Sequence, residues 1–181
     1  GATPKDGPSA GLAMVTAIVS VLTGTRTFDD VVVHSYSPSS SVWRNSRGSQ
    51  VLASSSDVEA PADLVIVTYG NGVPTALRAA KSMMTSSSPM YSNITVVEAP
   101  YLSAPAQDLR RYLQSSTHAL PDAPVVFADI CKAAMAPLAS ISTKLHSEGS
   151  LEGRKWALAA AADTYNPLGN LITFLSEADI L

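Results

Sequence analysis

The chain has 181 residues, of which 46% are hydrophobic and 15% charged, and its formal net charge is −3. A chain of this length buries about 70% of its unfolded surface as one domain, so it can build a sizeable core. The slightly acidic balance, without any basic run, excludes a nucleic-acid partner, because affinity for phosphate comes from clustered Lys and Arg.

The chain opens with a predicted helix over residues 8–23. Pro8 suits the first helical position, and Gly24 follows the last one. Apolar residues surround most of this helix, so we expect it to be buried on most sides. Its longest apolar stretch, 12–22, is too short to cross a bilayer, and no membrane partner is expected.

Next comes a short apolar strand, 31–33, followed by a polar, serine-rich stretch. The letters HSYSPSSSVWRNSRGSQ and SSSDVEAPAD have the composition of a loop or linker. The expected organisation is a helical segment over 1–26, a strand with a serine-rich linker over 27–61, and an α/β domain over 62–181.

From residue 63 onward, predicted strands and helices alternate. The strands are continuous runs of apolar, mostly β-branched residues, typical of strands buried on both faces of a sheet. This spacing predicts crossover connections and an α/β fold. We expect a mostly parallel sheet of about five strands with flanking helices, preceded by the amino-terminal helix. The expected strands are 64–67, 94–97, 125–128 and 156–160, and the expected helices are 74–84, 106–113, 137–146 and 173–179.

The motif GATPKDGPSAGLAM places Ser9 at the start of the amino-terminal helix. Backbone N–H groups and the positive end of the helix dipole would favour a developing oxyanion there. Residues 1–26 resemble the nucleophile segment of the Lon family of Ser-Lys peptidases, which every position from Pro4 to Gly11 matches. The resemblance implies that Ser9 is the nucleophile of a fragment of an ATP-dependent serine peptidase.

A serine nucleophile needs a base, because its hydroxyl is a weak nucleophile at its own pKa. In the Lon family this base is a lysine a few dozen residues downstream, in a Gly-Gly-x-Lys context. The corresponding stretch, NSRGSQVLASSSDVE, has no lysine, and the next lysine after Lys5 is Lys81. The alternative is that Ser9 only caps the helix, as serine commonly does.

Four stretches of the remaining chain carry a second resemblance: ADLVIVTYGNGVPTALRAAKSM, NITVVEAPYLSAPAQDLRRYL, APVVFADICKAAMAPLASISTKL and KWALAAAADTYNPLG. In their order and spacing they resemble the C-terminal domain of transketolase-like thiamine-diphosphate enzymes, above all the β subunit of 2-oxoacid dehydrogenase E1 components. This resemblance spans about residues 31–181. Ala99-Pro100-Tyr101 departs from it, because the family has an Arg-Thr pair there.

The second resemblance implies a dimerisation and docking domain that is not catalytic in isolation. The parent enzymes hold thiamine diphosphate and Mg on preceding domains, so this chain is expected to bind no cofactor. The expected partners are other subunits of a homo- or hetero-oligomer and the acyltransferase core of a 2-oxoacid dehydrogenase complex. Both families are at home in the mitochondrial matrix or the bacterial cytoplasm. The switch of resemblance between Thr25 and Val31 also suggests a composite of two proteins.

Two loops at predicted strand ends are candidate binding elements. Tyr69-Gly70-Asn71-Gly72 lies where open α/β sheets bind ligands, but a tight turn explains its glycines without phosphate binding. The stretch 164–169 has the composition of a turn. Within it, Tyr165, Asn166 and Pro167 are the candidates for a partner-facing loop.

The remaining candidate residues favour structural roles. His34, His118 and His146 lack ligand spacing with Asp, Glu or Cys, so no metal site is expected. Cys131 is the single cysteine, which excludes an internal disulfide framework and fits a reducing compartment. Lys132 could depress the thiol pKa, but without a well-placed histidine we expect a structural thiol. Asn93-Ile94-Thr95 matches a glycosylation sequon but falls where a strand is expected, so we do not expect it to be used.

Overall fold

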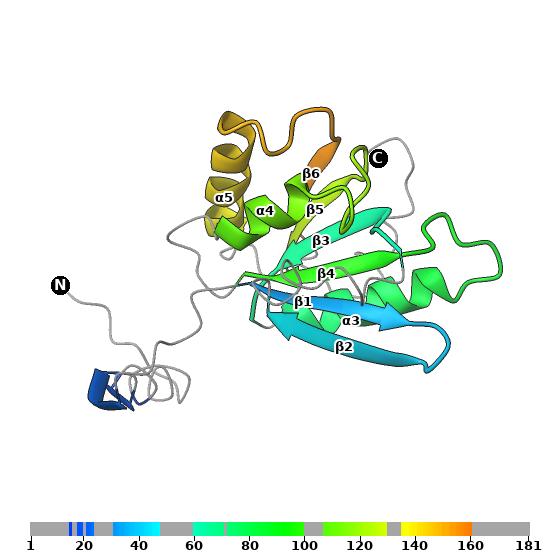
Figure 1. Cartoon of the computed structure of the whole chain (residues 1–181), viewed down its shortest axis with the longest axis horizontal. Coiled ribbons are helices and arrows are strands. Elements are labelled where there is room, and N and C mark those ends of the chain that lie inside the picture. Colours follow the sequence, from blue (N-terminus) through cyan, green and yellow to red (C-terminus); the bar gives the residue numbers. More distant parts are fainter. Residues whose placement is uncertain are drawn as a thin grey trace.

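A six-stranded sheet with helices on both faces forms the described part of the chain (Figure 1). The computed structural model describes residues 15, 18–19, 21–23, 31–47, 60–70, 72–99, 107–129 and 135–160. The strands are β1 (Val32–Ser37), β2 (Val42–Arg47), β3 (Leu64–Thr68), β4 (Ile94–Glu98), β5 (Val125–Asp129) and β6 (Trp156–Ala160). The helices are α3 (Gly72–Met84), α4 (Gln107–Gln114) and α5 (Met135–Ser147).

The strand order is β2-β1-β4-β3-β5-β6. Strands β3, β4, β5 and β6 are parallel, whereas β1 is antiparallel to both of its neighbours, β2 and β4. The predicted α/β fold with a mostly parallel sheet is therefore confirmed. The parallel strands form because each apolar run is followed by a helix that returns the chain to the same end of the sheet.

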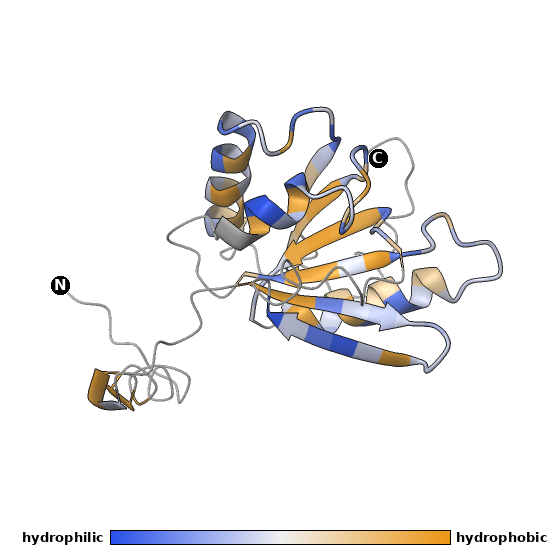
Figure 2. Ribbon diagram, in the orientation of Figure 1, coloured by the Kyte–Doolittle hydropathy of each residue, from blue (hydrophilic) through white to orange (hydrophobic). Residues whose placement is uncertain are grey.

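Two apolar layers hold the helices against the sheet. On one face, Ala76, Ala79 and Ala80 of α3 pack on a layer that includes Leu64 and Ile66 of β3. On the other face, α4 and α5 bury leucines against Val and Phe side chains of the same strands. Figure 2 shows the consequence, because the central strands are almost continuously hydrophobic while β2 is largely polar.

The serine-rich stretch contains more regular structure than predicted. We expected a loop or linker after residue 33, but β1 continues to Ser37 and β2 covers Val42–Arg47. The two strands form an antiparallel hairpin around a turn at residues 38–41, where Ser41 has a φ of 56°. Composition misled here because β2 is an edge strand, and one apolar residue, Trp43, is enough to anchor it on the α3 face.

The amino-terminal helix is confirmed at its described positions, which are helical at residues 15, 18–19 and 21–23. The expected burial is wrong for them. At least half of each apolar side chain is exposed, with values of 50–82% for Val15, Ile18, Val19, Val21 and Leu22. None of the described helices is long and apolar enough to cross a membrane. The predicted helix 173–179 lies outside the described residues.

Candidate functional site

Polar side chains end three neighbouring parallel strands. Thr68, Glu98 and Asp129 are the last residues of β3, β4 and β5. The chain leaves β3 toward β4 on one side and leaves β5 toward β6 on the other, so the connections diverge between β3 and β5. In open α/β sheets this divergence is the usual ligand crevice.

Where the start of α3 meets the end of β3, protein atoms are closely packed. A Cβ added at Gly72, the first residue of α3, would lie 2.2 Å from Thr68 Oγ1 and 3.3 Å from Asp129 Oδ2. Thr68 is fully buried, and its Oγ1 has no hydrogen-bond partner. Asp129 is 5% exposed beside the start of α3, where the helix dipole favours a carboxylate. The arrangement packs helix against strand and leaves no room for a ligand between Gly72 and Thr68.

The turn that precedes α3 uses its own amides. The N–H of Gly72 donates to the Tyr69 carbonyl at 3.0 Å, and the N–H of Val73 donates to the Gly70 carbonyl at 3.2 Å. Gly70 has a φ of 52°, a conformation that glycine adopts without a steric penalty. The tight turn expected here is therefore present at its described residues.

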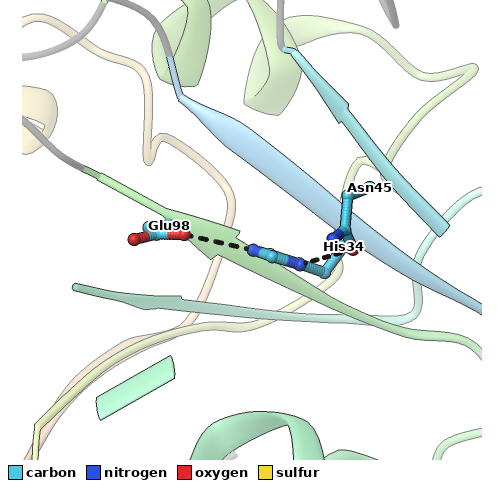
Figure 3. A network of polar contacts seen from close by, with 3 residues as sticks. All are labelled: His34, Asn45 and Glu98. Carbon is cyan, nitrogen blue, oxygen red and sulfur yellow. Dashed lines mark hydrogen bonds and ion pairs between the residues drawn. The ribbon is translucent and has the colours of Figure 1, made fainter. Parts of the chain in front are cut away.

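A polar network joins the β1–β2 hairpin to the parallel strands (Figure 3). His34 of β1 lies between Asn45 of β2, at 2.8 Å from Nδ1 to Oδ1, and Glu98 of β4, at 3.4 Å from Nε2 to Oε2. The histidine is only 5% exposed. Because both ring nitrogens are engaged, His34 cannot serve as the base of a nucleophile without breaking this network. It links the hairpin to the rest of the sheet.

The other predicted candidates among the described residues have structural partners. His118 stacks on Tyr112 with ring centroids 5.7 Å apart, and His146 lies 5.8 Å from the Trp156 ring. Asn93 donates its side-chain N–H groups to the carbonyls of two residues, at positions 60 and 61. Lys81 lies 5.5 Å from the centre of the Tyr36 ring.

The histidines do not come together, and within the described ranges no three His, Cys, Asp or Glu side chains could hold a metal ion. Ser9, Cys131, Lys132, Tyr165, Asn166 and Pro167 lie outside the described residues. The structure therefore supplies no distance for the predicted nucleophile or for the predicted partner-facing loop.

An arginine clamp at the opposite end of the sheet escaped the sequence analysis. Arg154 donates from Nη1 to the carbonyls of Leu120, at 2.5 Å, and Ala123, at 3.0 Å, and from Nη2 to that of Leu113, at 2.6 Å. Burial lowers the pKa of its guanidinium. The only sequence signal is a lone arginine before an apolar strand. That signal does not predict three carbonyl partners that are distant in the sequence.

A cavity of about 190 Å³ lies beside the clamp. Arg154, Glu152 and the buried Ser150 are among its lining residues, and the Ser150 hydroxyl has no hydrogen-bond partner. Nearby, burial raises the pKa of Tyr112 to about 12, and burial lowers the pKa of His118. The carbonyl acceptors already bind the guanidinium, and the Asp122 carboxylate acts on it electrostatically, so the cavity is part of the clamp.

The amino-terminal segment matches known proteins. Residues 1–35 match the family model of the Lon protease (S16) C-terminal proteolytic domain. The chain is 73% identical over 33 residues to the Lon protease of Brucella abortus (strain 2308), and 70% identical over 33 residues to that of Azospirillum brasilense. Each match covers 18% of this chain and 4% of the relative. No solved structure matches the chain.

These matches confirm the resemblance of the first residues to Lon peptidases, and they extend it to residue 35, inside β1. The chain spans only 4% of the length of these relatives, so their activity comes to this chain only as a proposal. The resemblance of residues 31–181 to thiamine-diphosphate enzymes stays a prediction, because the family match ends at residue 35.

Proposed function

We propose that residues 31–160 form a non-catalytic assembly domain, the role implied by their resemblance to the C-terminal domain of transketolase-like enzymes. The observation that supports this role is the close packing of α3 on β3, where Gly72 lies against Thr68 with no room for even one additional methyl group. In open α/β sheets, ligands bind where the connections diverge. Close packing between Gly72 and Thr68 takes up part of that place, which favours a role for the outer surfaces of the sheet.

We infer that the described residues at the carboxyl edge of this sheet do not hold thiamine diphosphate and Mg. A magnesium ion that carries a diphosphate is held by carboxylate and carbonyl oxygens together with waters. Glu98 is paired with His34, and Asp129 lies against the start of α3, on the far side of Thr68. These residues therefore support the proposal that the cofactor of the parent enzymes belongs to other domains.

The assembly role is tested on the full chain by sedimentation velocity over a hundredfold range of concentration. We expect a dimer or larger species, and cosedimentation with the acyltransferase core of a 2-oxoacid dehydrogenase complex. With added thiamine diphosphate and Mg²⁺, we expect no decarboxylation of a 2-oxo acid. A chain that stays monomeric at every concentration and does not bind the acyltransferase core would contradict the assembly role. Decarboxylation of the 2-oxo acid would contradict its non-catalytic character.

A second candidate function rests on the match of residues 1–35 to the Lon proteolytic domain. We propose that this segment is the nucleophile part of a Lon-type serine peptidase, with Ser9 as the nucleophile. The Lys81 ammonium lies over the Tyr36 ring at 5.5 Å, so this lysine already has a partner within the sheet domain. A base from another chain or segment is therefore part of this proposal.

Labelling with a fluorophosphonate tests the peptidase candidate. If Ser9 is activated, the full chain takes up the probe, Ser9→Ala does not, and peptide mapping places the adduct on Ser9. Lys81→Gln serves as the matched control and should label like the natural sequence. Absence of labelling in the presence and absence of ATP would leave Ser9 as a helix cap.

A further inference from the structure

The two edge strands of the described sheet differ in chemistry. Strand β2, at one edge, reads VWRNSR and exposes Arg44 and Arg47. Strand β6, at the other edge, reads WALAA and contains no charged residue and no proline. Charged side chains and proline are the usual devices that keep an edge strand from pairing with another chain. Of these two strands, only β2 has charged side chains.

An apolar side chain marks the unguarded edge. Leu158, the central residue of β6, is 40% exposed, although its register partner on β5 is the fully buried Phe127. Trp156 packs edge-on against the same Phe127 ring at 6.3 Å. The apolar layer beneath α5 therefore continues to the edge of the described sheet and stops there with Leu158 partly uncovered.

We propose that β6 pairs antiparallel with β6 of a second copy of this chain, around a two-fold axis through Leu158. This inference rests on the proposed assembly role and gives it a location. The sequence of β6 is self-complementary in that register. Trp156 is opposite position 160, an alanine, Ala157 is opposite Ala159, and Leu158 is opposite its own copy. The large Trp156 thus meets a small residue, the two Leu158 side chains meet each other, and no like charges face each other.

A second copy of the chain is a better pairing partner for β6 than an unrelated strand. An interface on a two-fold axis uses the same patch twice, which requires the self-complementarity that WALAA has. Pairing would also continue the apolar layer, because Leu158 and its copy would bridge the two Phe127 side chains. The result is one twelve-stranded sheet, with the guarded β2 strands at its two outer edges.

Disulfide trapping of the full chain tests the register. Directly opposite residues of an antiparallel pair have Cα atoms about 4.5–5.5 Å apart, which is within the range of a disulfide. In a Cys131→Ser background, Leu158→Cys should therefore give a disulfide-linked dimer under mild oxidation at low protein concentration. Val42→Cys is the matched control, because Val42 is 54% exposed on the opposite edge strand. It should remain monomeric on a non-reducing gel.

A charge at the same position tests the energetics. Leu158→Lys places two like charges opposite each other across the axis, and it should raise the dimer dissociation constant by at least about tenfold in sedimentation equilibrium. Val42→Lys should leave the dissociation constant unchanged. Both positions are exposed, so we expect both variants to fold. Circular dichroism checks this.

The outcomes separate the two proposals. A dimer that survives Leu158→Lys and does not crosslink at position 158 overturns the β6 pairing but leaves the assembly role intact. A natural chain that is monomeric throughout overturns the pairing and removes self-assembly from the proposed function. Crosslinking at both positions 158 and 42 to the same extent shows random collision, and it also overturns the proposed register.

Discussion

Gly72 should tolerate no side chain, because the start of α3 lies directly on Thr68. A Cβ at this position would lie 2.2 Å from Thr68 Oγ1, where real Cβ contacts are essentially never below 3.0 Å. Either α3 or the Thr68 side chain must then shift by roughly 1 Å to restore ordinary contact. Thr68 is fully buried in the packed centre of the sheet, so this shift strains neighbours on both strands.

Overpacking of this kind costs about 1–3 kcal/mol. We expect Gly72→Ala to lower the free energy of unfolding by about 2 kcal/mol, or ~4–8 °C in Tm for a domain of this size. Urea unfolding monitored by tryptophan fluorescence measures the loss. Trp43 and Trp156 are on β2 and β6, so the two probes report on both edges of the sheet.

The double variant decides whether the clash is the cause. Thr68→Ala removes the hydroxyl that the new methyl group meets, so Thr68→Ala/Gly72→Ala should recover at least about 1 kcal/mol relative to additivity. Gly70→Ala is the matched control, because Gly70 has a φ of 52° and nothing within 4 Å of an added Cβ. Its cost comes from the backbone alone and should not couple to Thr68. Full additivity of the Thr68 and Gly72 changes would refute the packing argument.

Three further predictions follow from the described contacts. Arg154→Met removes three hydrogen bonds from a charged donor and should lower the free energy of unfolding by roughly 2–4 kcal/mol, measured by urea titration. Burial raises the pKa of Tyr112 to about 12, above its unfolded value of 10.0, so the unfolded state ionises first as pH rises. Up to roughly 2–3 kcal/mol of stability should therefore be lost between pH 10 and 12, and Tyr112→Phe should abolish that part of the slope in denaturant midpoints. Ser41, at a φ of 56°, should gain roughly 0.5–1 kcal/mol on replacement by glycine, seen as a higher Tm.

The parallel core was predictable because its signal is local. Runs such as Leu64-Val65-Ile66-Val67 have no polar alternation, and the structure buries all four residues completely. The predicted helices also fell within one or two residues of α3, α4 and α5. In these segments the hydrophobic pattern of the sequence matches the burial of the residues in the folded chain.

The hairpin and the clamp were not predictable because their partners are distant in sequence. His34 is joined to Glu98, 64 residues away, and Arg154 bonds carbonyls up to 41 residues away. The residue types near His34 and Arg154 in the sequence do not predict those contacts. The close packing of Thr68 was not predictable for the same reason. It depends on the approach of Gly72 to the Thr68 hydroxyl, which has no hydrogen-bond partner.

The amino-terminal segment and the sheet should behave as independent parts. In the Lon relatives, the matched 33 residues belong to chains about 25 times longer. Here the described helical residues, including Val15 and Leu22, are 50–82% exposed and so add little buried area to the sheet. Deleting residues 1–26 should therefore change Tm by less than about 2 °C, because stability follows the apolar area removed from water. A larger loss would show that this helix packs on the sheet, and it would bring Ser9 close enough to the α/β domain for that domain to supply the missing base.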